Sequence, residues 1–560
     1  MRRTLFLALC IAVSAPSLKA QQPSSPFAKA SGDRSGTTLT IEEVADRVLR
    51  SESGLTARMR AFKPIVEVYV QNVEAHDRLG TVPVKDEYHL GQFEWSDVQG
   101  PTLKRLVPDR VNRSWLSRPF GMQLRPDGFT SMAVPDWRLL DIKRYEFKYV
   151  RREFLGEVRC LVLDVQPRGN PQDGFTGRIW VEDRDFNIVR FNGITRGLPG
   201  STLAIKRFWF NVDSWRINVS PGLWLPAYVY AEQQDAENRE APKIKTQLRM
   251  WGYDLKSVRP QQELTTITIE NDDVRDSSEQ PQQLSPAMSQ RLWEIQAEEN
   301  VLDRLSKAGL MAPPGEVDQV LETVVRNLQI TNNITIDPPV KTRVLLTSPL
   351  DSMVIGRTIT LSRGLIDVLP DEASLAMMLA HELAHIALGH RVIDTKFSFA
   401  DRLMVPDDEL LATVQYRHEM REELEADAKA IEYLKNSPYK EKLADAGLFL
   451  RALTENSKKL KNLIQPHVVA HIADSGQVSR LNELIAQAPT LAPENLEQVA
   501  ALTLGARIIV DPWSSKLELL KAANVPLSSA REKASLAVTP LVPYLRYADV
   551  RTIETKAERQ

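Results

Sequence analysis

Cysteine is nearly absent from this chain of 560 residues, which contains only Cys10 and Cys160. Cys10 lies inside an apolar N-terminal stretch, so a chain cleaved after Ala20 would keep Cys160 alone. A single thiol excludes the class of exported domains that intramolecular disulfides hold together. Cys160 lies in the sequence Val-Arg-Cys-Leu-Val-Leu, which is typical of a strand. We therefore interpret it as a small core residue rather than a reactive thiol.

The chain also lacks an excess of charge of either sign, since 71 Lys and Arg residues stand against 73 Asp and Glu residues. This balance argues against nucleic acid as the main partner, because such binding depends on clustered positive charge. Long apolar runs are missing as well. The most pronounced run, residues 5–13, is shorter than the about 20 residues that span a bilayer. We expect no transmembrane segment after the signal peptide is removed.

The N-terminus has the features of a secretory signal peptide. Arg2 and Arg3 precede the apolar residues 5–13, and the sequence Ser-Ala-Pro-Ser-Leu-Lys-Ala follows them. We predict that residues 1–20 are a signal peptide and that the mature protein is exported, either to the periplasm or as a secreted protein. The alternative is an uncleaved anchor.

The rest of the chain divides by pattern into two folded regions. Hydrophobic residues make up 43% and charged residues 26%, as in ordinary globular proteins. Residues 21–40 are rich in Gln, Ser, Pro and Gly, which predicts a linker. Residues 41–269 predict a helix at about 41–62 followed by an antiparallel β domain. A half-open barrel is one fold that this β domain could adopt. Alternating apolar residues mark its strands at 65–70, 145–150, 177–181, 188–191 and 206–210.

The second region is mostly helical. Residues 270–287 are charged and Gln-rich and predict an interdomain linker, residues 288–545 form the helical domain, and residues 546–560 form a tail. The fold class is therefore α+β. Eight of the ten tryptophans lie between Trp95 and Trp251, which indicates an aromatic β core. Six of the eight histidines lie between His381 and His471, which indicates a site in the helical domain.

Residues 373–390 contain the pattern His-Glu-x-x-His. Their Ala, Leu and Met residues favour a helix. His381 and His385 are four residues apart, so on a helix both imidazoles project from one face and can bind a single zinc ion. Glu382 lies beside the first histidine, where it can act on a water molecule at the metal rather than bind the metal.

A catalytic zinc site needs a third protein ligand and an open position for water. The metzincin class places a histidine six residues after the second ligand and a glycine three residues after it. That class is excluded, because position 391 is Arg and position 388 is Leu. His390 is five residues beyond His385, which turns it away from the ligand face. We interpret His390 as a residue that supports a ligand or has a structural role.

The other common third ligand is a glutamate on a later helix, and residues 417–434 have an acidic helical pattern. Glu423 and Asp427 are four residues apart and share a face. Glu423 can bind zinc, while Asp427 can accept a hydrogen bond from a ligand imidazole and fix its tautomer. The alternatives are a solvated acidic face, or Glu422 or Glu425 as the ligand.

The motif His-Glu-Leu-Ala-His at 381–385, followed by Glu-x-x-Ala-Asp at 423–427, resembles zinc metalloendopeptidases that include the CAAX prenyl protease, HtpX and BepA-type proteins. The resemblance covers about residues 316–485. It implies a zincin-type domain with a small sheet, one Zn²⁺ per chain and hydrolysis of peptide bonds. Segments 344–346 and 357–366 resemble the family's strand pair, whose exposed edge binds extended substrate.

Two stretches depart from that family's pattern. Asp351, Ser352 and Met353 stand where the family commonly has Asn-Ala-Phe, and they are our candidates for substrate binding. The family also has a His-Pro pair followed by an Arg. His471 and Arg480 are the corresponding catalytic candidates, with Arg480 offering a cation for the oxyanion. The alternative for this pair is a helix cap and a surface helix.

The membrane-embedded branches of that family have transmembrane helices, so the resemblance is to its soluble, exported branch. It implies an exported endopeptidase whose partner is an unfolded or misfolded envelope polypeptide, with envelope assembly machinery as a further expected partner. The alternative is a periplasmic chaperone, or a lipid- or lipoprotein-binding protein, with latent peptidase activity. The β domain weakly resembles the half-open barrels of lipoprotein carriers, although we favour the simpler interpretation that its tryptophans are core residues.

Overall fold

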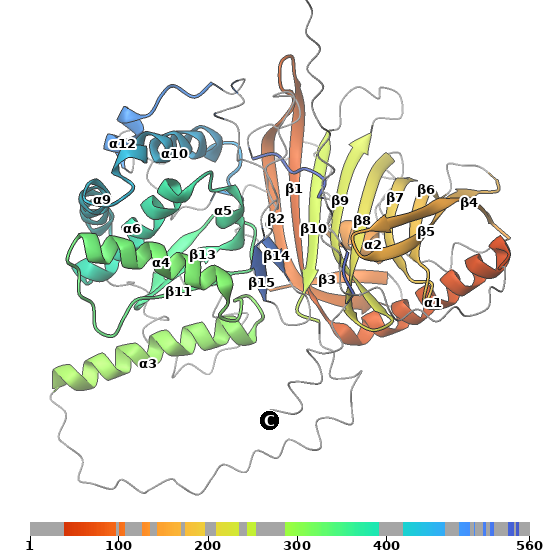
Figure 1. The fold of residues 1–560 in the computed structure, drawn as a ribbon, viewed down its shortest axis with the longest axis horizontal. Helices are drawn as coiled ribbons and strands as arrows, with labels where there is room; N and C mark the ends of the chain where they lie inside the picture. The colour runs from red at the N-terminus through yellow and green to blue at the C-terminus, as the bar shows by residue number, and fades with distance from the viewer. Residues whose placement is uncertain are drawn as a thin grey trace, which may run out of the picture. The chain divides into compact units, whose positions relative to one another are not determined.

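Ten antiparallel strands between residues 65 and 251 form one sheet in the computed structural model. Its strand order is β3-β2-β1-β10-β9-β8-β7-β6-β5-β4, and Figure 1 shows the run from β2 to β4. The first and last strands in sequence, β1 and β10, are therefore neighbours, third and fourth in this order. The strands are β1 (Ile65–His76), β2 (Gly80–Ser96), β3 (Gly100–Arg105), β4 (Tyr145–Leu155), β5 (Val158–Pro167), β6 (Phe175–Glu182), β7 (Ile188–Arg196), β8 (Trp209–Ser220), β9 (Leu223–Gln234) and β10 (Ile244–Trp251).

The structure describes most of the chain from residue 39 onward. The described residues are 39–96, 100–106, 126–134, 143–169, 174–196, 209–234, 243–253, 286–390, 418–464, 481–492, 495, 498, 508–510, 516–519, 536–541 and 545–547. The predicted signal peptide, nearly all of both predicted linkers and most of the predicted tail lie outside these residues. No helix among them has the length and apolar character needed to cross a membrane.

The predicted local structure of this half is confirmed where it is described. Helix α1 (Ile41–Phe62) and the strands predicted at 65–70, 145–150, 177–181 and 188–191 are present, and segment 206–210 enters the described residues only where β8 begins. Helix α2 (Pro126–Ala133) contacts β9, and its buried Phe129 packs edge-on against Phe210 of β8. Cys160 is fully buried in β5, and burial raises the pKa of its thiol to about 12. It is a core residue, as predicted.

One face of the sheet carries a row of aromatic and charged side chains across six neighbouring strands. Each residue of the row is the direct cross-strand partner of the next, in the order Trp180, Arg190, Trp215, Tyr228, Arg249 and Glu67. The Arg190 guanidinium lies over the rings of Trp180 and Trp215, 4.5 and 4.3 Å from their centroids. Direct partners share a face of a sheet, so the tryptophans and the charges form one continuous surface.

The second half is mostly helical and contains a three-stranded sheet in the order β11-β13-β12. Strand β11 pairs parallel with β13, whereas β12 pairs antiparallel with it. The α+β fold class is therefore confirmed. The elements are α3 (Pro286–Lys307), α4 (Glu316–Thr331), β11 (Lys341–Leu345), β12 (Ser352–Ile355), β13 (Thr358–Ser362), α5 (Arg363–Val368), α6 (Glu372–Leu388), α9 (Met420–Lys435), η6 (Lys440–Lys442), α10 (Leu443–Ser457), α12 (Asn482–Gln487), β14 (Ile508–Val510) and β15 (Leu517–Leu519).

The predicted strand segment 357–366 is only partly a strand. Strand β13 ends at Ser362, whose side chain accepts a hydrogen bond from the backbone N–H of Leu365 and so begins helix α5. A serine that caps a helix in this way competes with continuation of the strand. Strand β13 is the middle strand of the small sheet, so β11 and β12 are its two edge strands, and β12 begins inside the Asp351–Met353 stretch.

The sheet and the helical half belong to one compact unit, residues 41–560. Residues near the C-terminus return to the sheet. The side chain of Gln71 in β1 bonds to the backbone of Leu536 and Val538, and the Tyr228 hydroxyl donates to the carbonyl of Thr539. Further along, the carbonyl of Leu545 accepts from the backbone N–H of Glu157. The C-terminal segment therefore packs across the same sheet that the N-terminal half forms.

A buried ion pair ties α1 to the sheet and gives a test of its stability. Arg216 of β8 donates to both carboxylate oxygens of Glu52, at 2.6 and 2.8 Å, and each side chain is 1% exposed. We expect Glu52→Gln to lower the free energy of unfolding by about 3 kcal/mol, because it leaves a buried guanidinium without its counter-charge. Urea unfolding followed by tryptophan fluorescence measures the change.

The matched control is Arg50→Ala in the same helix. Arg50 pairs with Asp46 at the surface, where the two side chains are 72% and 55% exposed. Such a pair contributes less than about 0.5 kcal/mol. Equal effects of the two substitutions would contradict a stabilising role for the buried pair.

Candidate metal centre

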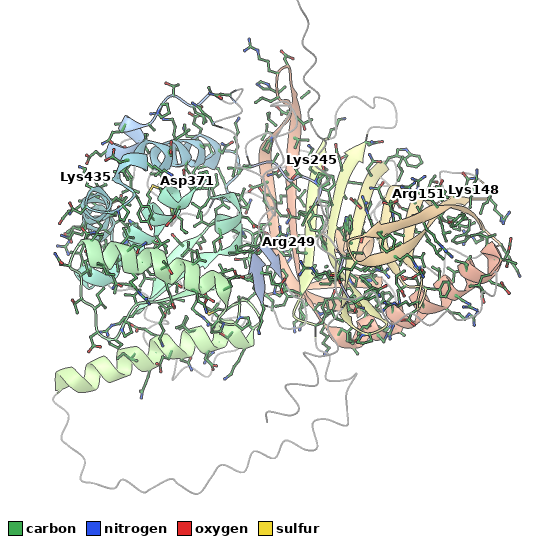
Figure 2. All side chains as sticks on the ribbon, in the orientation of Figure 1. Lys148, Arg151, Lys245, Arg249, Asp371 and Lys435 are labelled. Carbon is green, nitrogen blue, oxygen red and sulfur yellow. The ribbon has the colours of Figure 1, made fainter. Side chains whose placement is uncertain are left out.

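Helix α6 carries the His-Glu-x-x-His pattern and is fixed at both ends. Its N-cap Asp371, labelled in Figure 2, accepts a hydrogen bond from the backbone N–H of Ser374 at 2.7 Å. Its C-cap Gly389 has a left-handed conformation, with φ of 73°, which ends the helix as glycine commonly does. Between these caps, His381 and His385 lie one turn apart and are 4% and 1% exposed.

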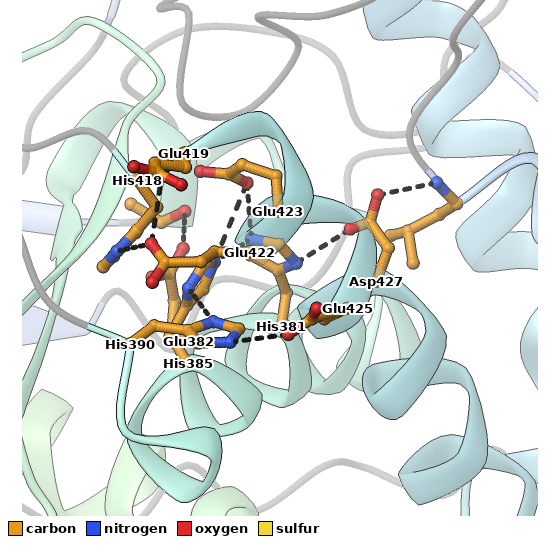
Figure 3. Close-up of polar contacts among 12 residues, drawn as sticks. His381, Glu382, His385, His390, His418, Glu419, Glu422, Glu423, Glu425 and Asp427 are labelled. Carbon is orange, nitrogen blue, oxygen red and sulfur yellow. Dashed lines mark hydrogen bonds and ion pairs between the residues drawn. The ribbon is translucent and has the colours of Figure 1, made fainter.

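Helix α9 packs against α6 and brings Glu423 to the two histidines (Figure 3). Glu423 Oε2 lies 3.4 Å from His381 Nε2 and 3.7 Å from His385 Nε2. The two Nε2 atoms lie 3.0 Å apart. The apolar side of α9, including Ala426 and Ala430, is buried, so Glu423 is held on the inner face of the helix.

These three side chains fit a zinc ion. Two imidazoles and one carboxylate form a ligand set found in catalytic zinc sites, which leaves a fourth position for water or substrate. Ligand atoms bound tetrahedrally at zinc distances lie roughly 3.4 Å apart. The observed separations of 3.0, 3.4 and 3.7 Å surround that value, and the group is buried. His381, His385 and Glu423 would therefore hold the metal.

Each histidine of this set has a partner on its other ring nitrogen. His381 Nδ1 lies 2.9 Å from Asp427 Oδ1, one turn beyond Glu423 on α9. The second oxygen of Asp427 accepts a hydrogen bond from the backbone N–H of Leu481 at 3.3 Å. A carboxylate on Nδ1 keeps the proton there and leaves the Nε2 lone pair for a metal.

His390 is the corresponding partner of His385. The left-handed turn at Gly389 folds the chain back, so that His390 Nδ1 lies 3.1 Å from His385 Nδ1 although five residues separate them. His390 Nε2 in turn lies 3.4 Å from Glu425 Oε2. When His385 Nδ1 donates to His390, the Nε2 atom of His385 is free for the metal. His390 and Glu425 thus orient a ligand, and neither is in the ligand set.

Glu382 contacts the edge strand of the small sheet. It is 4% exposed, and its Oε1 accepts a hydrogen bond of 2.7 Å from the hydroxyl of Ser352. Ser352 is the first residue of β12, which within the described residues has a strand neighbour on one side only. The structure therefore places Ser352 against Glu382. Asp351 bonds through its backbone to Ser362, and the Met353 carbonyl accepts from Thr360 in β13.

His418 is a site residue that the sequence analysis missed. Its ring stacks on that of His385, with centroids 4.0 Å apart and planes at 19°. Burial, together with the neighbouring His385, lowers the pKa of His418 to about 4, so its imidazole is neutral at physiological pH. Its position five residues before Glu423, within the histidine-rich part of the chain, is the signal that could have indicated it. The catalytic candidates His471 and Arg480 lie outside the described residues.

Two histidines one turn apart, a nearby glutamate from a second helix and a buried carboxylate beside the first histidine define the site of a zinc-dependent hydrolase. The comparison with protein families agrees. Residues 316–467 match the model of Peptidase family M48, a family of zinc metallopeptidases. This stretch contains His381, Glu382, His385, Glu423 and Asp427, and the chain is a metalloendopeptidase, as predicted.

Among curated proteins, none matches the chain. Among solved structures, a putative outer membrane lipoprotein-sorting protein domain from Vibrio parahaemolyticus is 11% identical and covers 37% of this chain and 91% of its own, with a TM-score of 0.19. A LolA superfamily protein from Nitrosomonas europaea is 12% identical over 38% of this chain and 92% of its own, with a TM-score of 0.18. Similarities at this level carry no argument about function.

The Asp427–His381 contact predicts a change in metal affinity. We expect Asp427→Asn to weaken zinc binding about 10- to 100-fold, because the amide no longer fixes the proton on His381 Nδ1. Competition with a chromophoric chelator measures the affinity. Glu432→Gln, an exposed position on the same helix, is the control and should leave the affinity unchanged. Equal affinities of the Asp427→Asn variant and the wild type would contradict the role given to Asp427.

Proposed function

We propose that this chain is an exported zinc-dependent endopeptidase that hydrolyses peptide bonds in unfolded or misfolded proteins of the cell envelope. The observation that carries the peptidase part is Glu382, which lies buried beside the His381–His385–Glu423 set and against an edge strand. Export rests on the signal-peptide pattern of residues 1–20. The soluble, exported branch of the metallopeptidases is part of this proposal, and the same signal-peptide pattern supports it.

The residues around the metal set have different roles in the proposed reaction. When bound, a zinc ion supplies Lewis acidity that polarises the scissile carbonyl and lowers the pKa of a water molecule. Glu382 takes the proton of the attacking water and then delivers it to the leaving amine. Ser352 holds Oε1 of Glu382 at 2.7 Å and so restricts the direction in which the carboxylate faces.

Strand β12 supports the choice of an extended polypeptide as substrate. Its backbone is paired with β13 on one side, and its first residue touches Glu382. Within the described residues its other side has no strand partner, and an extended peptide that adds there forms main-chain hydrogen bonds that do not depend on its side chains. Such recognition suits unfolded proteins of varied sequence, because a folded protein rarely offers a free strand.

Two substitutions test the division of roles in the purified mature chain. We expect Glu382→Gln to retain about one zinc per chain and to cleave an unfolded test protein at least about 100-fold more slowly, since it removes the general base. We expect His385→Ala to lose both the metal and the activity, since only two ligands remain. Metal content and cleavage are measured on the same preparations, with Glu432→Gln as the control.

Each contrary result has a distinct meaning. Equal zinc loss in both variants would refute the separation of ligand from general base. Zinc in the wild type without any cleavage would favour the alternative of a chaperone, or a lipid- or lipoprotein-binding protein, with a latent peptidase. Protection of an unfolded client from aggregation by the Glu382→Gln protein supports the chaperone form of that alternative, and co-purified acyl chains support the lipid-binding form.

A further inference from the structure

The segment that leads into the edge strand is held by the ten-stranded sheet. Residues 346–351 connect β11 to β12, and Ser348 lies near the centre of this connection. The Ser348 backbone N–H and hydroxyl both donate to the carboxylate of Glu67 in β1, each at 2.6 Å. Glu67 is 1% exposed and Ser348 is 3% exposed, so both bonds are shielded from water. Hydrogen bonds to a buried carboxylate are among the stronger contacts in a protein.

Glu67 and Ser348 are enclosed by helix α5 on the other side. The Glu67 carboxylate also accepts from the Tyr88 hydroxyl at 2.9 Å and from Arg363 Nη2 at 3.3 Å. Gly364 approaches the segment so closely that a Cβ atom added there would lie 1.7 Å from the carbonyl oxygen of Ser348. The segment is thus confined between β1 and the first turn of α5, and it has little room to shift.

A second carboxylate of the sheet holds the same segment from another direction. Asp86 of β2 accepts hydrogen bonds from the backbone N–H groups of Asn462 and Leu463, the latter at 2.6 Å. The carbonyl of Leu463 accepts in turn from the backbone N–H of Leu350 at 2.6 Å. Leu350 is two residues before Ser352. Asp86 therefore determines where the chain enters β12.

We propose that Glu67 and Asp86 are positioning residues for the peptidase reaction, an inference that rests on the proposed function. They hold residues 348–350 and thereby set the place of β12, its backbone edge opposite β13 and the Ser352 hydroxyl on Glu382. The sheet is then a supporting part of the active site. Within the described part of the chain, the hydrogen bonds of Glu67 and Asp86 go to residues outside the metal set, whose ligands lie on α6 and α9.

Loss of these contacts should change the kinetic constants in a way that loss of folding alone does not. Displacement of β12 weakens the binding of extended substrate and misaligns Glu382, so KM rises and kcat falls. Zinc affinity stays constant, because α6 and α9 remain packed. A merely structural role would instead change stability and activity together.

The experiment compares Glu67→Gln with Glu52→Gln in the mature chain. Both carboxylates are 1% exposed, belong to the N-terminal half and bond to an arginine, but Glu52 bonds to Arg216 and to the backbone N–H of Ile188 within the sheet, whereas Glu67 bonds to Ser348 and Arg363 in the peptidase half. We expect Glu67→Gln to lower kcat/KM for a fluorogenic peptide about 10- to 100-fold, as for a misplaced reacting group, with unchanged zinc content. Glu52→Gln should stay within about twofold of the wild type at a temperature where it is folded.

Ser348→Ala keeps the inference testable if Glu67→Gln does not fold. It removes one hydrogen bond to the same carboxylate and should lower kcat/KM in the same direction. When both single variants fold, the double variant should lose little more than Glu67→Gln alone, because the two changes break one contact. Asp86→Asn tests the second contact and should also lower kcat/KM with zinc retained.

Four outcomes would overturn the inference. The first is wild-type kinetics in Glu67→Gln, or in Ser348→Ala if Glu67→Gln does not fold, and the second is wild-type kinetics in Asp86→Asn. The third is a loss of activity in Glu52→Gln as large as that in Glu67→Gln. The fourth is a loss of zinc that parallels the loss of activity. The proposed function fails separately, when the wild type shows no cleavage that depends on Glu382. In that case both the proposed function and the positioning role of Glu67 and Asp86 fail. If the wild type shows cleavage that depends on Glu382 and Glu67→Gln has wild-type kinetics, only the positioning role fails.

Discussion

Ionisable side chains buried between α6 and α9 impose the strictest physical requirement in this structure. Four residues of the site, His381, Glu382, His385 and Glu423, are each no more than 6% exposed. Charged groups removed from water destabilise a fold unless opposite charges, hydrogen bonds or a metal ion compensate them. The site meets this requirement in two ways. The Nε2 atoms of the two histidines face each other in the metal set, and their Nδ1 atoms face Asp427 and His390. The two helices can pack closely only in the arrangement that satisfies all of these groups.

The same requirement joins the two halves of the chain. Glu67, Asp86, Arg363 and Arg249 are all buried where the ten-stranded sheet meets the helical half. Arg249, labelled in Figure 2, lies 3.9 Å from Asp367 in α5. Burial lowers the pKa of Arg363 to about 10, which still leaves it charged at neutral pH. A sliding motion between the halves would expose or unpair these charges together, so the contact favours one relative placement.

Features that depend on local sequence could be predicted. The periodicity and composition of α1, α6 and α9 indicated helices, and alternation indicated strands of the sheet, because each of these signals lies within one segment. The spacing within His381–His385 and Glu423–Asp427 indicated which side chains share a face, and the helices brought the two pairs together. These are consequences of a repeat of 3.6 residues per turn and need no knowledge of the rest of the fold.

Features that depend on distant contacts could not be predicted in the same way. No local pattern shows that β1 pairs with β10, or that Ser348 meets Glu67, 281 residues earlier in the chain. Residues 363–366 were predicted as part of a strand but belong to helix α5, because Ser362 caps that helix and ends the strand before it. His390 was expected to lie off the ligand face as a supporting or structural residue, but its contact with the Nδ1 atom of His385 depends on the left-handed turn at Gly389, which helix geometry does not contain. Each of these features is set by an irregular turn or by tertiary contacts.

This difference has a consequence for how the active site is assembled. The metal set lies on two helices that are close in sequence, and the contacts that orient its histidines come from those helices and the residues next to them. The substrate edge is different, since β12 has only four residues and its entry is held by β1, β2 and the segment after α10. A short edge strand cannot specify its own register, because its few cross-strand pairs stabilise it only weakly. In the proposed function, metal binding is therefore a local property of this chain, whereas alignment of a peptide with Glu382 depends on the N-terminal sheet.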